Sequence, residues 1–173
     1  MQSNFVVSVI TADKPGIIEI LSSIINKNKG NWLASNFTRL SGQFAGIVEF
    51  SCPTNFSSEI EQDLNRLQSK GFQLHLAKGE EHHHDTVKTV SLSIIGNDKL
   101  GIINEISRVL AEHHVNLLKL ESSCEPAPNW GGQLFKAAAT LELSEDIDFD
   151  LIQEAIEDIA NDLIVEVEFQ VPG

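Results

Sequence analysis

The sequence has few basic residues, few cysteines and no long hydrophobic run, and each shortage argues against a class of protein. It contains 12 Lys and Arg against 25 Asp and Glu, a formal charge of −13, whereas nucleic-acid binders cluster cations against phosphates. No apolar stretch approaches the roughly 18 residues typical of a transmembrane helix. Cys52 and Cys124 lie in no metal-ligand spacing, which fits a reducing compartment and predicts two buried, unpaired thiols.

Targeting and catalytic motifs are also scarce. The segment Met1-Gln2-Ser3-Asn4 has neither the basic region nor the cleavage site of a signal peptide, so we expect a soluble, cytoplasmic protein. The sequence has no nucleophile elbow, no P-loop and no paired dinucleotide-binding glycines, so we expect no enzymatic activity and no cofactor. Clustered imidazoles can bind zinc, but the consecutive residues His82, His83 and His84 point in different directions and favour a solvated linker.

The chain contains an internal repeat at an offset of 85 residues. The 18 residues from Ser8 and the 18 from Ser93 share eight identities, whereas unrelated segments would share about one. Each copy continues through the same periodicities: a β segment, a helix, two β segments, a second helix and a last β segment. Strands are expected at 5–11, 32–40, 44–50 and 72–76, then at 87–95, 115–122, 134–143 and 164–171, and the second helices at 57–69 and 148–162.

The order βαββαβ, found twice, predicts an α+β protein of two ferredoxin-like units. Each unit would be an antiparallel sheet with both helices on one face. The units are expected at 1–78 and 87–173, joined by a linker at 79–86 that has no apolar face to bury. Ser57 and Asp148 are natural N-caps for the second helices.

The best-matched residues lie on the turn from the first strand to the first helix of each copy. A helix N-terminus presents unpaired N–H groups and the positive end of the helix dipole, which suit a carboxylate, and glycine lets a ligand approach the backbone closely. Asp13 and Asp98 are expected to cap these helices, and capping is compatible with ligand binding. The two turns read Asp13-Lys14-Pro15-Gly16 and Asp98-Lys99-Leu100-Gly101.

With a D-K-x-G-I-I turn in each unit and an Asn at the start of each second strand, the sequence resembles tandem ACT domains, modules that bind amino acids and regulate metabolism. Two such units most resemble the glycine cleavage system transcriptional repressor family. The resemblance implies a non-enzymatic regulator that binds a small amino acid, with glycine as the first candidate. It also implies repression through a DNA-binding activator protein, without direct contact to DNA.

The resemblance further implies where the ligand binds. ACT domains pair side by side, and the ligand lies between the turn of one unit and the strand edge of its partner; the two copies could form that pair within one chain. Leu100 stands where the family often has Pro, which argues against equal affinity at the two sites, and Asn31 and Asn116 are equally well explained as polar residues entering a strand. The first site would comprise Asp13, Lys14, Pro15, Gly16 and Ile17, with an amide from Asn116 or Asn31, and the second Asn97, Asp98, Leu100, Gly101 and Ile102.

Two other functions remain open at this point. A small-molecule enzyme on a ferredoxin-like scaffold would need an acid–base pair that converges in space. An interaction module with degenerate ligand sites would need neither a bound ligand nor catalytic residues.

Eight acidic residues crowd the last predicted helix and the segment before it, and no Lys or Arg occurs from 137 to 173. A solvated helix face is one explanation, but such crowding also repels phosphates and attracts a basic protein. We therefore expect Glu154, Glu157 and Asp158 to contact the partner regulator. Exposed edge strands or helix faces further predict a homodimer.

Overall fold

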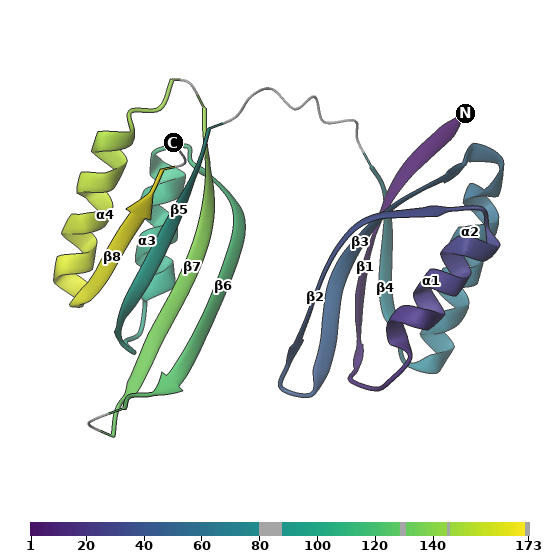
Figure 1. Cartoon of the computed structure of the whole chain (residues 1–173), viewed down its shortest axis with the longest axis horizontal. Helices are drawn as coiled ribbons and strands as arrows, with labels where there is room; N and C mark the ends of the chain where they lie inside the picture. The colour runs from purple at the N-terminus through teal and green to yellow at the C-terminus, as the bar shows by residue number, and fades with distance from the viewer. Residues whose placement is uncertain (80–87, 129–130, 145, 172–173) are drawn as a thin grey trace. The chain divides into compact units, whose positions relative to one another are not determined.

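The computed structural model describes residues 1–79, 88–128, 131–144 and 146–171. The chain divides into two compact units, Met1–His83 and His84–Gly173 (Figure 1). Each unit is a four-stranded antiparallel sheet with two helices on one face, as the sequence predicted. The predicted linker and its three histidines lie outside the described residues except for Gly79, whose N–H donates to the carbonyl of Asn4 at 2.8 Å.

In the first unit the sheet order is β2-β3-β1-β4, so β1 and β3 are central and β2 and β4 are the edges. Ser57 is not an N-cap, because a short 3₁₀ helix precedes α2 and the Ser57 hydroxyl donates to the Thr54 carbonyl at 2.8 Å. The elements are β1 (Gln2–Ala12), α1 (Ile17–Lys27), β2 (Asn31–Leu40), β3 (Gln43–Pro53), a 3₁₀ helix (Thr54–Phe56), α2 (Ser57–Asn65), a second 3₁₀ helix (Arg66–Lys70) and β4 (Gln73–Lys78).

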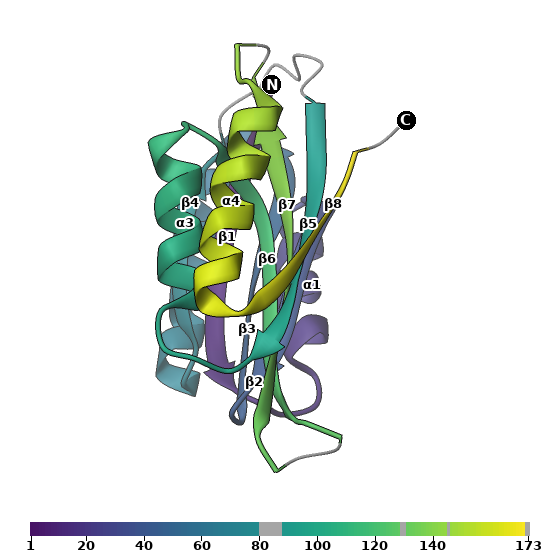
Figure 2. The same ribbon diagram turned by 90° about the vertical axis from the view of Figure 1, so that its left-hand side faces the viewer.

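The second unit repeats this topology with the order β6-β7-β5-β8. Figure 2 views it from the helical side, where α3 and α4 lie side by side across the sheet. Asp148 caps α4 as predicted, accepting a hydrogen bond from the Asp150 N–H at 3.1 Å. The elements are β5 (Lys88–Asn97), α3 (Ile102–Glu112), β6 (Asn116–Pro126), β7 (Gln133–Leu143), α4 (Phe149–Leu163) and β8 (Val165–Gln170).

The strand registers define which residues of the two units are equivalent. Arg39 and Thr11 both pair with Phe44, and Cys124 and Gly96 both pair with Phe135. The edge strands β2 and β6 even share a register shift at the same place, beside Leu33 and Leu118. The repeat offset is therefore 85 residues through β2 and β6 but 91 in β3 and β7, because the second hairpin is longer.

Each unit has its own core between the sheet and its helices. Val7, Val9 and Leu21 are buried in the first, and Leu92 and Ile94 occupy the corresponding layer of the second. Alternation along the strands places these side chains toward the helices and their sequence neighbours on the helix-free face.

The two cysteines differ in their surroundings. Both are free, and Cys52 is buried as expected, but Cys124 is exposed. The prediction for Cys124 was wrong because it lies on the edge strand β6, all 11 residues of which are exposed.

Candidate functional site

The two strand–helix turns share a backbone conformation that requires glycine. Gly16 and Gly101 are the N-cap residues of α1 and α3 and have left-handed φ values of 90° and 94°. Neither helix receives a side-chain cap, so the expectation that Asp13 and Asp98 cap them was wrong. The left-handed glycine stands between each aspartate and the helix, and the first-turn N–H groups are left without a side-chain acceptor.

The first turn is closed by an ion pair. The Asp13 N–H donates to the Gly42 carbonyl at 3.0 Å, and its carboxylate accepts a hydrogen bond from Arg39 Nη1 at 3.2 Å. The Lys14 ammonium lies 5.3 Å from the centre of the Phe72 ring, a cation–π contact. Asp13 is thus neutralised by a cation from the neighbouring edge strand.

The second turn keeps the backbone geometry but lacks that cation. The Asp98 N–H donates to the Gln133 carbonyl at 2.9 Å, matching the bond of Asp13. The position of Arg39 is taken by Cys124. Partial desolvation, and then the charge of Asp98 and a hydrogen bond with it, raise the pKa of the Cys124 thiol, so Asp98 faces a neutral group. Leu100 is fully exposed, at 101%.

A hollow of about 390 Å³ adjoins the second turn where β5 ends. Asn97, which the sequence predicted as a site residue, lines it, and the equivalent residue of the first unit is Ala12. Asn161 and Glu166 also line it, and sequence reasoning missed both. The pattern of α4 and β8 marked them as polar and solvent-facing but did not show that they meet the end of β5.

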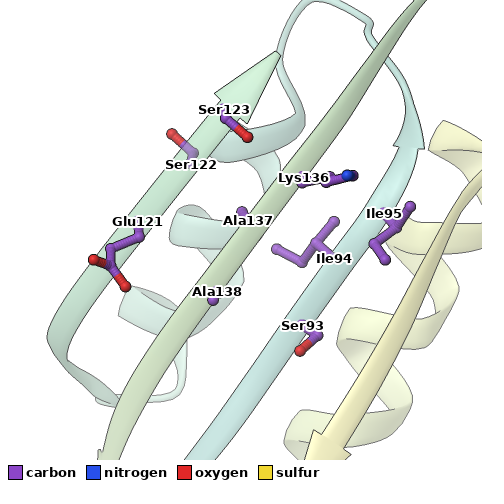
Figure 3. A pocket seen from close by; sticks show the side chains of 9 residues that line it. All are labelled: Ser93, Ile94, Ile95, Glu121, Ser122, Ser123, Lys136, Ala137 and Ala138. Carbon is purple, nitrogen blue, oxygen red and sulfur yellow. The ribbon is translucent and has the colours of Figure 1, made fainter. Parts of the chain in front are cut away.

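A second hollow, of about 320 Å³, lies on the helix-free face of the second sheet and shares Ile95 with the first (Figure 3). Its charged residues already have partners in the chain. Lys136 bonds Glu125 at 2.7 Å, which lowers the pKa of that carboxyl, and Lys119 bonds Glu121 at 2.9 Å. The lining residues are Ser93, Ile94, Ile95, Glu121, Ser122, Ser123, Lys136, Ala137 and Ala138.

The two predicted asparagines lie at the opposite end of each sheet from the turn of the same unit. Asn31 pairs with Ser51, which pairs with Asn4, eight residues before Ala12. Eight residues of strand span about 26 Å. Asn116 occupies the same position in the second unit, where its Nδ2 donates to Glu142 Oε2 at 2.6 Å. Neither asparagine therefore reaches the turn of its own unit.

The acidic face of α4 is exposed at the three residues expected to contact a partner, Glu154, Glu157 and Asp158. On the neighbouring helix, Arg108 is held by Glu105 and Glu112 at 2.9 and 2.8 Å. Among the described residues of α3 and α4 it is the only Lys or Arg, so the helical surface of the second unit is strongly negative.

Sequence reasoning also missed a buried carboxylate that joins α1 to α2. Asp63 accepts hydrogen bonds from Lys27 at 2.8 Å, Asn28 at 3.0 Å and Arg66 at 2.7 Å. The bonds from Lys27 and Asn28 lower the pKa of Asp63. Asp63 lies three residues after Ile60 and therefore on the same buried face of α2. This spacing could have identified Asp63 from the sequence.

Within the described ranges, no three His, Cys, Asp or Glu side chains are grouped as a metal site would require. No helix there is long and apolar enough to span a membrane.

Comparison with known proteins gives the family. The ACT domain family matches residues 3–76 and 90–161. A protein of unknown function from Galdieria sulphuraria is 25% identical, with full coverage of both chains and a TM-score of 0.85. A protein proposed to be a glycine cleavage system transcriptional repressor is 18% identical, with 99% of each chain covered and a TM-score of 0.69. No curated protein sequence matches significantly. ACT domains are regulatory ligand-binding modules, and this chain belongs to the ACT domain family, of which it carries two copies.

Proposed function

We propose that this protein is a non-enzymatic regulator that senses a small amino acid, with glycine as the first candidate. The observation that carries the proposal is the strand–helix turn that both ACT units repeat, with its left-handed glycine and its helix N-terminus without a side-chain cap. A helix N-terminus of this kind favours an anionic group such as the ligand carboxylate.

The second turn is the better candidate for the ligand. The N–H groups of Ile102, Ile103 and Asn104 precede the first helical hydrogen bond, which Glu105 donates to Gly101, and they would bind the carboxylate. Asp98 has no guanidinium beside it and would attract the ammonium group. At the first turn Arg39 already neutralises Asp13, so we expect weaker binding there.

An asparagine reaches a turn only if it comes from another ACT unit. The edge strands β2 and β6 are exposed over most or all of their length. Antiparallel pairing of two such edges would bring the first residue of one strand, Asn31 or Asn116, to the end of the other, where the turn lies. We propose that the ligand's second contact is made in this way.

The geometry gives less support to the enzyme alternative. Two carboxylates, Glu166 and Glu168, line one further hollow, of about 370 Å³. They are two residues apart on one strand and lie on the same face, so they do not face one another across a cavity. No His–carboxylate pair lines any of the hollows described in the chain.

We further propose that the protein represses transcription of the glycine cleavage system through a DNA-binding activator. Similarity to the proposed repressor and the acidic face of α4 support this function. An acidic surface repels DNA and attracts a basic protein, so its association with the activator should weaken as salt rises. Replacement of Glu154, Glu157 and Asp158 by Gln, Gln and Asn should weaken the association and leave amino-acid binding intact.

Calorimetric titration with the common amino acids, glycine first, tests the sensor. Saturable heat with one of them is expected. Absence of heat with all of them would refute sensing and favour an interaction module. A gel shift with the isolated protein should show no sequence-specific retardation of promoter DNA, and specific retardation would refute repression through a partner.

A further inference from the structure

The helix-free faces of the two sheets differ sharply in charge. On the first sheet, every second residue from Asn4 to Ala12 of β1 and from Gln43 to Ser51 of β3 lies on this face, together with the residues of β2 and β4 that pair with them. Glu49 is the only Asp, Glu, Lys or Arg among these residues. On the second sheet the equivalent face carries five glutamates, among them Glu121 and Glu166, and two lysines. In a chain of net charge −13, an almost uncharged sheet face is an exception.

The uncharged face also exposes large apolar side chains at its centre. Ile10 and Ile47 lie on the central strands β1 and β3 and are 46% and 52% exposed, although central strands usually offer the best covered positions. They are diagonal neighbours, because Ser8 pairs with Ile47 and Ile10 pairs with Ala45. The residues opposite the two isoleucines, Ser8 and Ala45, have small side chains.

The second unit shows what the same position looks like on a solvated face. Ala138 pairs with Ser93 as Ile47 pairs with Ser8, so Ala138 is the counterpart of Ile47. There the surface is hollowed, and the hollow is lined by Lys136 and Glu121 (Figure 3). These two side chains form ion pairs with Glu125 and Lys119, respectively. Exposed isoleucine is therefore not a requirement of the fold at the position of Ile47, whereas Ile95, the counterpart of Ile10, is itself 44% exposed on the charged face.

We propose that the helix-free face of the first unit is the dimer interface of this protein and that it packs against the same face of a second copy. Depletion of charge and exposed aliphatic side chains mark the core of protein interfaces. Because the face is nearly neutral, it offers no charge pattern for a nucleic acid or a basic protein, whereas a two-fold axis would place two identical isoleucine pairs together.

The area of the face suits a dimer. Three strands about 30 Å long and the six-residue β4, about 20 Å long, lie about 4.8 Å apart and present roughly 500 Å² per copy, or about 1,000 Å² in total, the minimum expected of a specific interface. Two sheets packed face to face lie about 10 Å apart with interdigitating side chains, which the small side chains of Ser8 and Ala45 would accommodate. The sequence suggested edge strands or helix faces as the dimer interface, and the proposed surface is neither. The proposed dimer does not require a bound amino acid.

Sedimentation velocity of the full chain tests the interface. The wild type should sediment with twice the 19.1 kDa chain mass at high concentration and dissociate on dilution. Ile47→Glu should raise the dimer dissociation constant at least about 100-fold, because each interface would bury two unpaired carboxylates. The matched control, Ala138→Glu at the equivalent position of the second unit, should change the constant less than about 2-fold.

Ile10→Ser provides a second, uncharged variant if Ile47→Glu unfolds, and it should also weaken the dimer. Thermal unfolding verifies that each variant is folded. Because both copies are acidic and the interface is neutral, raising the salt concentration should leave the dimer intact or tighten it. A wild type that stays at 19.1 kDa at every concentration would overturn the proposal. So would a folded Ile47→Glu that dimerises normally, an Ala138→Glu that disrupts the dimer equally, or dissociation by salt.

Discussion

Replacement of Gly101 by Ala should weaken ligand binding more than it lowers the stability of the fold. The left-handed backbone costs a non-glycine residue about 1–2 kcal/mol, and the lower entropy of unfolded Ala returns about 0.4–1 kcal/mol. A Cβ at Gly101 meets nothing within 4 Å, so no steric clash adds to this cost. We expect a net loss of about 1 kcal/mol, which lowers the Tm of a unit of this size by about 4–8 °C.

Binding should suffer more than stability, because relief of the left-handed strain at residue 101 would displace the N–H groups of the residues that follow it, which would hold the carboxylate. We expect the Kd for the amino acid to rise at least about 10-fold, equivalent to 1.4 kcal/mol, in calorimetric titration. Gly71→Ala is the matched control, since Gly71 has a φ of 86° and an equally open Cβ position but precedes no helix. Gly16→Ala reports on the first turn. Unchanged binding by a folded Gly101→Ala would refute the second turn as the site.

Three further comparisons test the fold and the candidate site. Asp63→Asn should lower the free energy of unfolding by about 2 kcal/mol at neutral pH. Because the folded-state pKa of Asp63 is lowered, this contribution is complete above its ordinary value near 4 and is lost as pH falls through the folded value. Urea unfolding measured across pH tests this dependence, with Glu61→Gln as control. A destabilisation by Asp63→Asn that persisted in acid would contradict it. Cys124→Arg should give Asp98 the ion pair of the first turn and weaken amino-acid binding relative to Cys124→Ser; equal titrations would contradict it. Asp148→Ala should cost about 1 kcal/mol and Ser57→Ala little; equal thermal losses would count against the caps described.

The fold could be predicted because it depends on patterns that are local in the sequence. Alternation marked the strands, three-to-four spacing marked the helices, and the repeat showed that one topology occurs twice. Errors occurred where two local signals competed. Ser57 has the character of an N-cap, but the chain enters α2 through a 3₁₀ helix, and Asp13 does not cap because Gly16 takes the N-cap position with a left-handed backbone.

The parts of the candidate site that could not be predicted depend on register. A comparison at an offset of 85 aligns Arg39 with Cys124, but only strand pairing shows that these positions meet Asp13 and Asp98. Beyond the hairpins the offset becomes 91, so the same comparison does not align Ile47 with Ala138 at all.

The differences at these two pairs of equivalent positions, Arg39 with Cys124 and Ile47 with Ala138, distinguish the two units. In the first unit Asp13 is paired with Arg39 and the helix-free face is nearly uncharged with exposed isoleucines. In the second unit Asp98 faces the neutral Cys124 and the helix-free face is charged and hollowed. One copy of the duplicated domain would thus serve association and the other ligand binding. The variants Ile47→Glu and Gly101→Ala should accordingly impair different functions, each leaving the other intact.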